Sequence, residues 1–242
     1  MTIILVGGGP DTVTTPVVFD RFVRELRVRA DGRVPRVAVV LVDQEGSSEL
    51  FLPAYLRPLE SRIVCEVLPV LLRFNKDADP AAFDGVDGIV VGGGPTPGYL
   101  AGLLPSAEVI RHAVSGGVPY MGFSAGAMVA PARALVGGYR IKGTEVCSEE
   151  CSEGLDELEI RDGLGLVPFA VDVHTAQAGT LSRVVGAVAQ GLLDRAAAVD
   201  ENTALVLRHA DLDELEVIGA GHCWTIRGAG PKATVSVLSA HG

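Results

Sequence analysis

Short apolar runs alternate with longer segments of mixed polarity along the first part of the chain. Continuous apolar runs predict buried strands, and apolar residues spaced three and four apart predict helices. The predicted strands are residues 3–6, 36–42, 63–72, 88–91 and 118–123. The predicted helices are residues 15–30, 48–59, 97–104, 106–115 and 124–135. This alternation predicts βαβ units and a parallel sheet with helices on both faces.

The last third of the chain has a different pattern. A helix is predicted at residues 180–194. The strands predicted after it are residues 196–207, 215–226 and 233–238. We expect these strands to form an antiparallel extension of the same domain. No repeat, linker or low-complexity tract interrupts the sequence, so residues 1–242 are expected to form one domain, with the acidic stretch 143–162 as a surface excursion.

Composition and charge narrow the functional classes. The chain is 48% hydrophobic and 21% charged, and its 30 glycines among 242 residues suit tight turns between buried strands. The formal net charge of −10 argues against nucleic acid as the main partner and is compatible with a cationic substrate. No basic segment precedes the apolar run at residues 3–6, and no apolar stretch is long enough to span a bilayer. We therefore expect a cytoplasmic protein without a membrane partner.

The four cysteines do not form a recognisable metal or redox motif. Cys147 and Cys151 are not spaced as in CxxC, and no paired histidines follow them. Cys65 and Cys223 lie far from both in the sequence. We expect reduced thiols, no metal and no cofactor.

A candidate nucleophile lies at Ser124, in the sequence Gly122-Phe123-Ser124-Ala125-Gly126. This is a G-x-S-x-G pattern between a predicted strand and a predicted helix. Such a turn strains the serine backbone and requires small neighbours. It projects the hydroxyl from the carboxyl edge of the sheet and directs the next backbone N–H at a developing oxyanion.

A serine nucleophile needs a general base and a group that orients the base. The histidines of the chain are His112, His174, His209, His222 and His241. Position favours His174, which follows the apolar segment 164–173, and His222 comes second. The orienting acid remains open, and the candidates are Asp172, Asp200 and Glu201.

Four motifs in order resemble those of the S51 serine peptidase family, which includes peptidase E and cyanophycinase. They are Gly92-Gly93-Gly94, GFSAGA at residues 122–127, DGLGLVPFAVDVH at residues 162–174 and VDENTAL at residues 199–205. The resemblance runs from Ile3 to about Leu207. It implies a flavodoxin-like three-layer sandwich, akin to class I glutamine amidotransferases.

The resemblance also implies roles for particular residues. Ser124 would be the nucleophile, His174 the general base and Glu201 the orienting carboxylate. The oxyanion donors would be the N–H groups of Ala125 and of Gly93 or Gly94. The expected reaction is hydrolysis of a peptide or isopeptide bond in a small peptide, without a cofactor, and a homodimer is left open.

The pocket residues depart from the family pattern. Thr96 follows Pro95 where relatives carry an Asn, Asp or Gln near this point, Val173 replaces a polar residue, and Arg183 is retained. Asp172, Thr96 and Arg183 are weaker candidates for substrate binding. The substrate stays open among dipeptides with an N-terminal Asp, β-Asp-Arg and others.

Two other functions remain alternatives. One is an α/β-hydrolase-type esterase that uses His209 or His222, although such enzymes have the chain order serine, acid, histidine. The other is a non-catalytic relative that binds a small peptide or amide. Nucleotide binding by Gly7-Gly8-Gly9 is disfavoured because Thr12 occupies the third glycine position of the G-x-G-x-x-G fingerprint.

Overall fold

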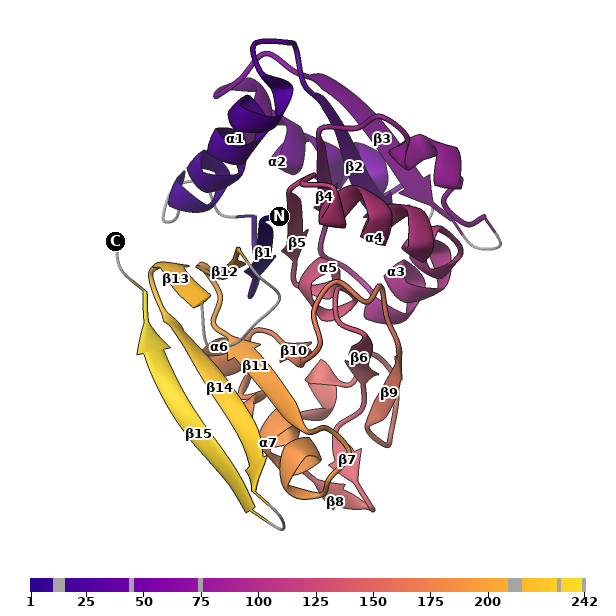
Figure 1. Ribbon diagram of the computed structural model, residues 1–242. Coiled ribbons are helices and arrows are strands. Elements are labelled where there is room, and N and C mark those ends of the chain that lie inside the picture. The colour runs from indigo at the N-terminus through magenta and orange to yellow at the C-terminus, as the bar shows by residue number, and fades with distance from the viewer. Residues whose placement is uncertain (11–15, 44–45, 74–75, 209–214, 230–231, 241–242) are drawn as a thin grey trace.

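The computed structural model describes residues 1–10, 16–43, 46–73, 76–208, 215–229 and 232–240 (Figure 1). Within these residues the central sheet has seven strands in the order β13-β12-β1-β5-β4-β2-β3. Its parallel strands are β1 (Ile3–Val6), β2 (Arg36–Val42), β3 (Glu66–Leu72), β4 (Gly88–Val91) and β5 (Tyr120–Phe123). Two antiparallel strands extend it beyond β1, namely β12 (Thr203–Leu207) and β13 (Leu215–Gly219).

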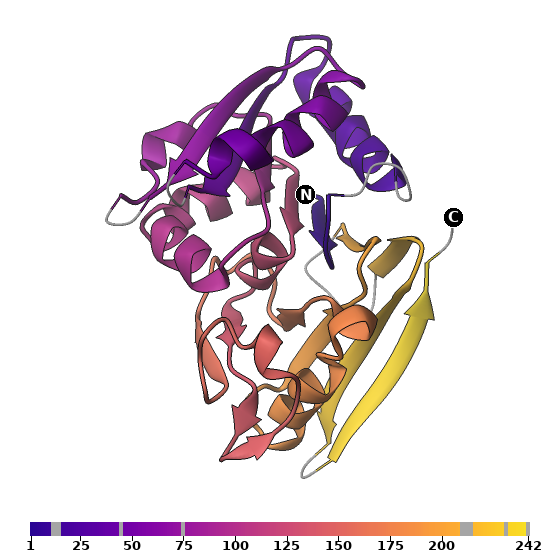
Figure 2. The same cartoon turned by 180° about the vertical axis from the view of Figure 1, so that it is seen from behind.

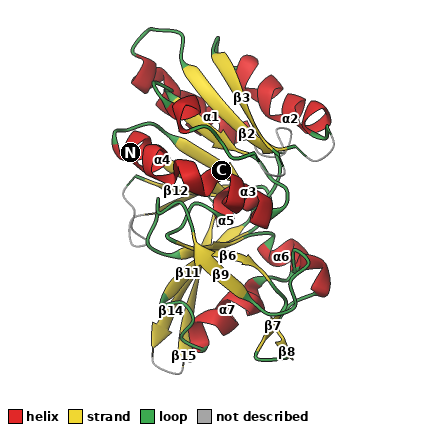
Figure 3. Cartoon of the chain, turned by 90° about the vertical axis from the view of Figure 1, so that its right-hand side faces the viewer, coloured by secondary structure: helices red, strands yellow, loops and turns green. Residues whose placement is uncertain are grey.

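Helices cover both faces of this sheet (Figure 3). One layer consists of α1 (Pro16–Ala30) and α2 (Ser48–Glu60), and the other contains α3 (Thr96–Leu103) and α4 (Ala107–Ser115). Along β1, Ile3 and Leu5 pack toward one layer, whereas Ile4 and Val6 pack toward the other. Each such buried side chain contributes about 1.5–3 kcal/mol, which explains why the central strands are continuously apolar. The predicted mostly parallel three-layer sandwich is confirmed.

A second sheet forms the C-terminal part of the molecule. Its order is β10 (Ala170–Asp172), β11 (Arg195–Val199), β14 (His222–Ala229) and β15 (Lys232–Ser239). All its pairs are antiparallel except β10 with β11. The helix α7 (Leu181–Ala189) packs against this sheet. Figure 2 shows the β14–β15 hairpin at the end of the molecule remote from β2 and β3.

The antiparallel extension is present, but its predicted strand boundaries are wrong. The expected strands 196–207 and 215–226 are each divided into two strands that belong to different sheets. The first division falls at Asp200, Glu201 and Asn202, and Asn202 has a φ of +55°. A buried carboxylate and a left-handed residue turn the chain there, although the apolar positions on both sides look like one strand.

The predicted helix 124–135 is also wrong over most of its length. Only α5 (Ala125–Met128) is helical, and β6 (Arg133–Gly137) follows it and pairs with β9 (Glu159–Asp162). Pro131 explains the stop, since a proline disfavours helical backbone in the residue before it and cannot donate a hydrogen bond.

The remaining elements are short. They are the strands β7 (Arg140–Ile141) and β8 (Thr144–Glu145), the helix α6 (Thr175–Ala178) and the 3-10 turns η1 (Pro80–Phe83), η2 (Leu104–Ser106) and η3 (Glu149–Cys151). The acidic stretch 143–162 therefore contains β8, η3 and β9, and much of it is exposed. Among the described helices, none combines the length and apolarity needed to cross a membrane.

Candidate active site

Ser124 lies at a strained turn directly after β5, at the carboxyl edge of the sheet. Its φ is +51°, and its backbone N–H donates to the carbonyl of Val6 at 2.9 Å. A Cβ on Gly122 would lie 2.3 Å from the carbonyl oxygen of Gly126, and a Cβ on Gly126 would lie 2.4 Å from that of Val91. Both positions therefore require glycine, as the G-x-S-x-G pattern predicts.

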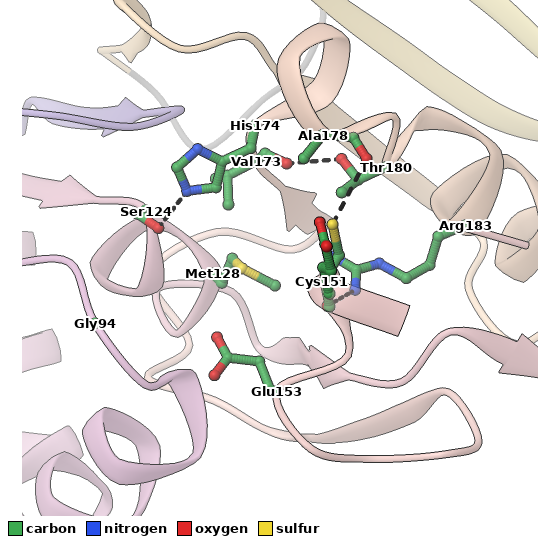
Figure 4. Close-up of a pocket in the computed structure, with 11 residues that line it drawn as sticks. Gly94, Ser124, Met128, Cys151, Glu153, Val173, His174, Ala178, Thr180 and Arg183 are labelled. Atoms are coloured by element: carbon green, nitrogen blue, oxygen red, sulfur yellow. Dashed lines mark hydrogen bonds between the residues drawn. The ribbon is translucent and has the colours of Figure 1, made fainter. Parts of the chain in front are cut away.

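His174 follows β10 and contacts Ser124 directly. Its Nε2 lies 2.8 Å from Ser124 Oγ (Figure 4), and its Nδ1 lies 2.7 Å from Glu201 Oε1. The backbone of His174 is also anchored, because its N–H donates to the Gly7 carbonyl at 2.9 Å. A carboxylate beside Nδ1 favours the tautomer with its proton there, which leaves Nε2 free to accept the serine proton.

Glu201 reaches His174 from the turn between β11 and β12. Its backbone N–H donates to Gln177 Oε1 at 2.9 Å, which ties the turn to α6. The neighbouring Asp200 points elsewhere: it is buried and accepts from the backbone N–H groups of Ala176 at 2.9 Å and His222 at 3.0 Å. Of these two adjacent carboxylates, Glu201 is the one that contacts the imidazole.

Gly7 and Gly8 make room for the histidine and the glutamate at the end of β1. A Cβ on Gly8 would lie 2.9 Å from both His174 Cε1 and Glu201 Cγ, and a Cβ on Gly7 would lie 2.1 Å from the Asp200 carbonyl oxygen. Sequence reasoning considered these glycines only for nucleotide binding. The sequence shows only that the glycine run follows a predicted strand, and it is the sheet order that places this strand beside the strand of Ser124.

Replacement of Gly8 by alanine is expected to lower kcat/KM about 100-fold, since displacement of catalytic groups by an ångström has effects of this size. The new methyl group meets side chains rather than backbone, so the fold should survive. The measurement is hydrolysis together with a thermal melt. Gly98→Ala is the matched control, because its Cβ would meet its neighbours at 3.6 Å or more. Equal activity in both variants would contradict the assigned packing.

A cavity of about 400 Å³ opens beside Ser124 and His174 (Figure 4). Its walls come from the turn at Ser124, from the loop before α3, from the chain around α6 and from the acidic stretch near η3. The lining residues are Gly94, Ser124, Met128, Glu150, Cys151, Glu153, Val173, His174, Ala178, Thr180 and Arg183. The acidic surface excursion thus forms one wall of the cavity, a contact that the sequence did not predict.

The two glycines expected to donate to an oxyanion differ in their surroundings. The Gly93 N–H already donates to the hydroxyl of Tyr55 at 2.8 Å, and the Gly93 carbonyl accepts from the hydroxyl of Tyr99 at 3.0 Å. Gly94 lines the cavity. Of the two glycines, Gly94 is therefore the one that lines the cavity, whereas the Gly93 N–H is already hydrogen-bonded within the protein.

Of the three weaker substrate-binding candidates, Asp172 does not reach the cavity. It is fully buried, and its oxygens accept from Arg183 Nε at 2.9 Å and Nη2 at 2.6 Å. Arg183 lines the cavity, but its Nη1 also donates to the Cys151 carbonyl at 2.6 Å. Burial alone would lower the pKa of Arg183, but the attraction and hydrogen bonds of Asp172 outweigh burial and raise it. This pair is therefore a charged structural link.

Thr96, the third of these candidates, is fully buried and bonded to the cavity wall. Its hydroxyl donates to Glu153 Oε1 at 2.7 Å, and its backbone N–H lies 3.2 Å from the same oxygen. Thr96 thus positions Glu153 instead of facing the cavity itself.

The other histidines stand apart from Ser124 where they are described. His222 lies against Asp200, with 3.3 Å between Nδ1 and Oδ2, and His112 is exposed on α4. His209 and His241 lie outside the described residues. All four cysteines are free, and burial raises the pKa of the Cys151 thiol at the cavity wall.

Comparisons with known proteins place this geometry in a family. The sequence model described as "Peptidase family S51" matches residues 70–215. A peptidase from an acI-B1 Actinobacterium has a similar structure, with a TM-score of 0.71 and 20% identity over 100% of this chain and 95% of that one. A putative peptidase E protein from Listeria monocytogenes EGD-e gives a TM-score of 0.58 and 17% identity, over 91% and 98% of the two chains.

A comparison with curated proteins finds no match. Because their identities to this chain are low, the two similar structures support the fold alone. The family model covers more than half of the chain and includes Ser124, His174 and Glu201. The chain belongs to peptidase family S51.

Proposed function

We propose that this protein is a serine peptidase that hydrolyses a peptide or isopeptide bond in a small peptide. The observation that carries the proposal is the pair of consecutive hydrogen bonds from Ser124 through His174 to Glu201, at 2.8 Å and 2.7 Å. Nucleophile, base and orienting acid are thereby in the order that acyl transfer requires. Membership of a peptidase family supports the same reaction.

In the first half of the reaction, Ser124 Oγ attacks the scissile carbonyl carbon while His174 Nε2 takes the hydroxyl proton. Glu201 stabilises the imidazolium that results. The carbonyl oxygen becomes an oxyanion facing the N–H groups of Ala125 and Gly94, and a well-placed donor of this kind contributes about 3–4 kcal/mol. The C–N bond then breaks, and the imidazolium proton passes to the leaving amine.

In the second half, water attacks the acyl ester on Ser124 while His174 again accepts a proton. The ester C–O bond breaks, the proton returns to Oγ, and a carboxylic acid leaves. The cavity of about 400 Å³ suits a dipeptide or an exposed isopeptide rather than a segment of a folded protein. None of these steps calls on a group outside the chain except water.

Labelling with a fluorophosphonate tests the proposed nucleophile and base together. We expect covalent labelling of Ser124, and we expect His174→Ala to slow it about 100-fold or more, since a general base contributes at least this much. His222→Ala is the matched control, because His222 pairs with Asp200 instead of Ser124.

Loss of labelling in the His222 variant alone would favour the esterase alternative. Complete absence of labelling, with binding of a peptide or amide that survives Ser124→Ala, would favour the non-catalytic alternative. Either result would overturn the proposed function.

A further inference from the structure

Besides His174, the cavity is lined by more negatively charged than positively charged side chains. These side chains are Glu150, Glu153 and Arg183. Glu150 lies in η3 and Glu153 two residues beyond it, so both carboxylates belong to the same wall. The described lining residues thus place two carboxylates and one guanidinium around the space next to Ser124.

Arg183 does not offset these carboxylates. Its charge is already paired with Asp172, through bonds of 2.6 Å and 2.9 Å, and both side chains are almost completely buried. The remaining nitrogen, Nη1, donates to the carbonyls of Cys151 at 2.6 Å and Gly138 at 3.3 Å. Four of the five N–H donors of Arg183 are thus used within the protein, and its charge is balanced by Asp172, so the charge that the cavity presents is negative.

Glu153 is held by hydrogen bonds from Thr96. The hydroxyl of Thr96 donates to Oε1 at 2.7 Å, and its backbone N–H donates to the same oxygen at 3.2 Å. Figure 4 shows Glu153 on the side of the cavity opposite His174, with Met128 between the two in this view. A carboxylate held in this way loses little conformational freedom when it binds a cation, so its attraction is used efficiently.

We propose that this cavity selects substrates with a cationic group on the acyl side of the scissile bond, and that Glu153 and Glu150 determine this specificity. The inference rests on the proposed function of the same site. The recognised group is an ammonium or guanidinium, from either a free N-terminus or a basic side chain. A substrate with an acidic residue there would add a third carboxylate to the wall and would be disfavoured.

The experiment measures the rate at which diphenyl phosphonate probes label Ser124. The probes carry a lysine, norleucine or aspartate side chain, each with a free or an acetylated α-amine. We expect the lysine probe with a free α-amine to react about tenfold faster than the acetylated norleucine probe, which has no cationic group. The acetylated aspartate probe should react slowest. Loss of the preference on acetylation identifies the α-ammonium as the recognised group. Loss on changing lysine to norleucine identifies the side chain.

Substitution of Glu150 and Glu153 tests whether the preference for cationic probes depends on their carboxylates. Glu153→Gln keeps an oxygen for Thr96 but removes the charge, and we expect it to reduce the cation preference to about threefold or less, with a further loss in Glu150→Gln/Glu153→Gln. Glu149→Gln is the control, because Glu149 is exposed in the same turn and does not line the cavity. Raising the salt concentration should also weaken the preference in the unaltered protein.

The outcomes separate this inference from the proposed function. Labelling of Ser124 without a cation preference, or with a preference that Glu153→Gln and Glu149→Gln change equally, overturns the inference and leaves the peptidase proposal standing. If no probe labels Ser124, the peptidase proposal fails. Calorimetric binding of lysinamide, norleucinamide and acetyl-norleucinamide to Ser124→Ala then still decides whether the cavity prefers a cation.

Discussion

Ser124→Ala is expected to lower kcat/KM for a cleaved dipeptide by about 10,000-fold or more, with no loss of folding stability. The alanine removes the attacking oxygen and leaves the oxyanion donors and the cavity in place. The assay uses a panel of dipeptides with acidic, neutral and basic N-terminal residues together with β-Asp-Arg. Ser115→Ala, an exposed serine in α4, is the control.

His174→Ala is expected to cost nearly as much, and the double variant Ser124→Ala/His174→Ala should be no worse than either single variant. The reason is that the two groups act as one unit, joined by the 2.8 Å hydrogen bond. Glu201→Gln keeps the shape of the side chain and removes its charge, so a loss of about 100-fold to 10,000-fold is expected. Additive losses, or activity retained in Ser124→Ala, would show that another group attacks the substrate.

The central fold could be predicted because both faces of its strands are buried. In β2 and β4 nearly every residue is apolar, so the runs stand out from the mixed helical segments around them. The same criterion failed where the chain changes sheets. The apolar runs on either side of Asp200 look like one strand, because periodicity does not report which sheet a residue joins.

Site residues could be predicted from the sequence where a local motif marks them. Ser124 is identified by five consecutive residues whose spacing follows from the turn itself. His174 and Glu201 have no such local signature. Position alone favoured His174 only weakly, and it left the acid open among Asp172, Asp200 and Glu201. The family resemblance selected His174 and Glu201, and the structure brings both into hydrogen-bonding distance.

Contacts between distant segments account for most of what the sequence did not predict. The Tyr55 hydroxyl that accepts from the Gly93 N–H lies 38 residues earlier in the sequence. Glu153 and Thr96, which are hydrogen-bonded, are 57 residues apart. Neither contact leaves a periodic or compositional trace, because each depends on how two elements pack. The role of Arg183 is a third case, since the family resemblance suggested a substrate contact, whereas its hydrogen bonds to Asp172 and Cys151 make it a structural link.

Asp172→Asn is expected to destabilise the protein by about 3–5 kcal/mol, because it leaves the buried guanidinium of Arg183 without its counterion. For a chain of this length, the melting temperature should fall on the order of 10 °C. Chemical denaturation and thermal melting measure the effect. Asp162→Asn, at an exposed position in β9, is the matched control and should change stability by less than about 0.5 kcal/mol. A stable Asp172→Asn protein with weakened substrate binding would instead restore Asp172 as a binding residue.

Arg183→Lys separates the charge of this link from its geometry. A lysine keeps the positive charge, but one ammonium cannot reproduce the two bonds to Asp172 and also hold the Cys151 carbonyl. Because Cys151 lies between Glu150 and Glu153, loosening its carbonyl should move the acidic wall of the cavity. We therefore expect Arg183→Lys to raise KM for a basic dipeptide more than it lowers kcat, whereas Asp172→Asn acts mainly on stability. Equal KM values for Arg183→Lys and the unaltered protein would show that the wall does not depend on this anchor.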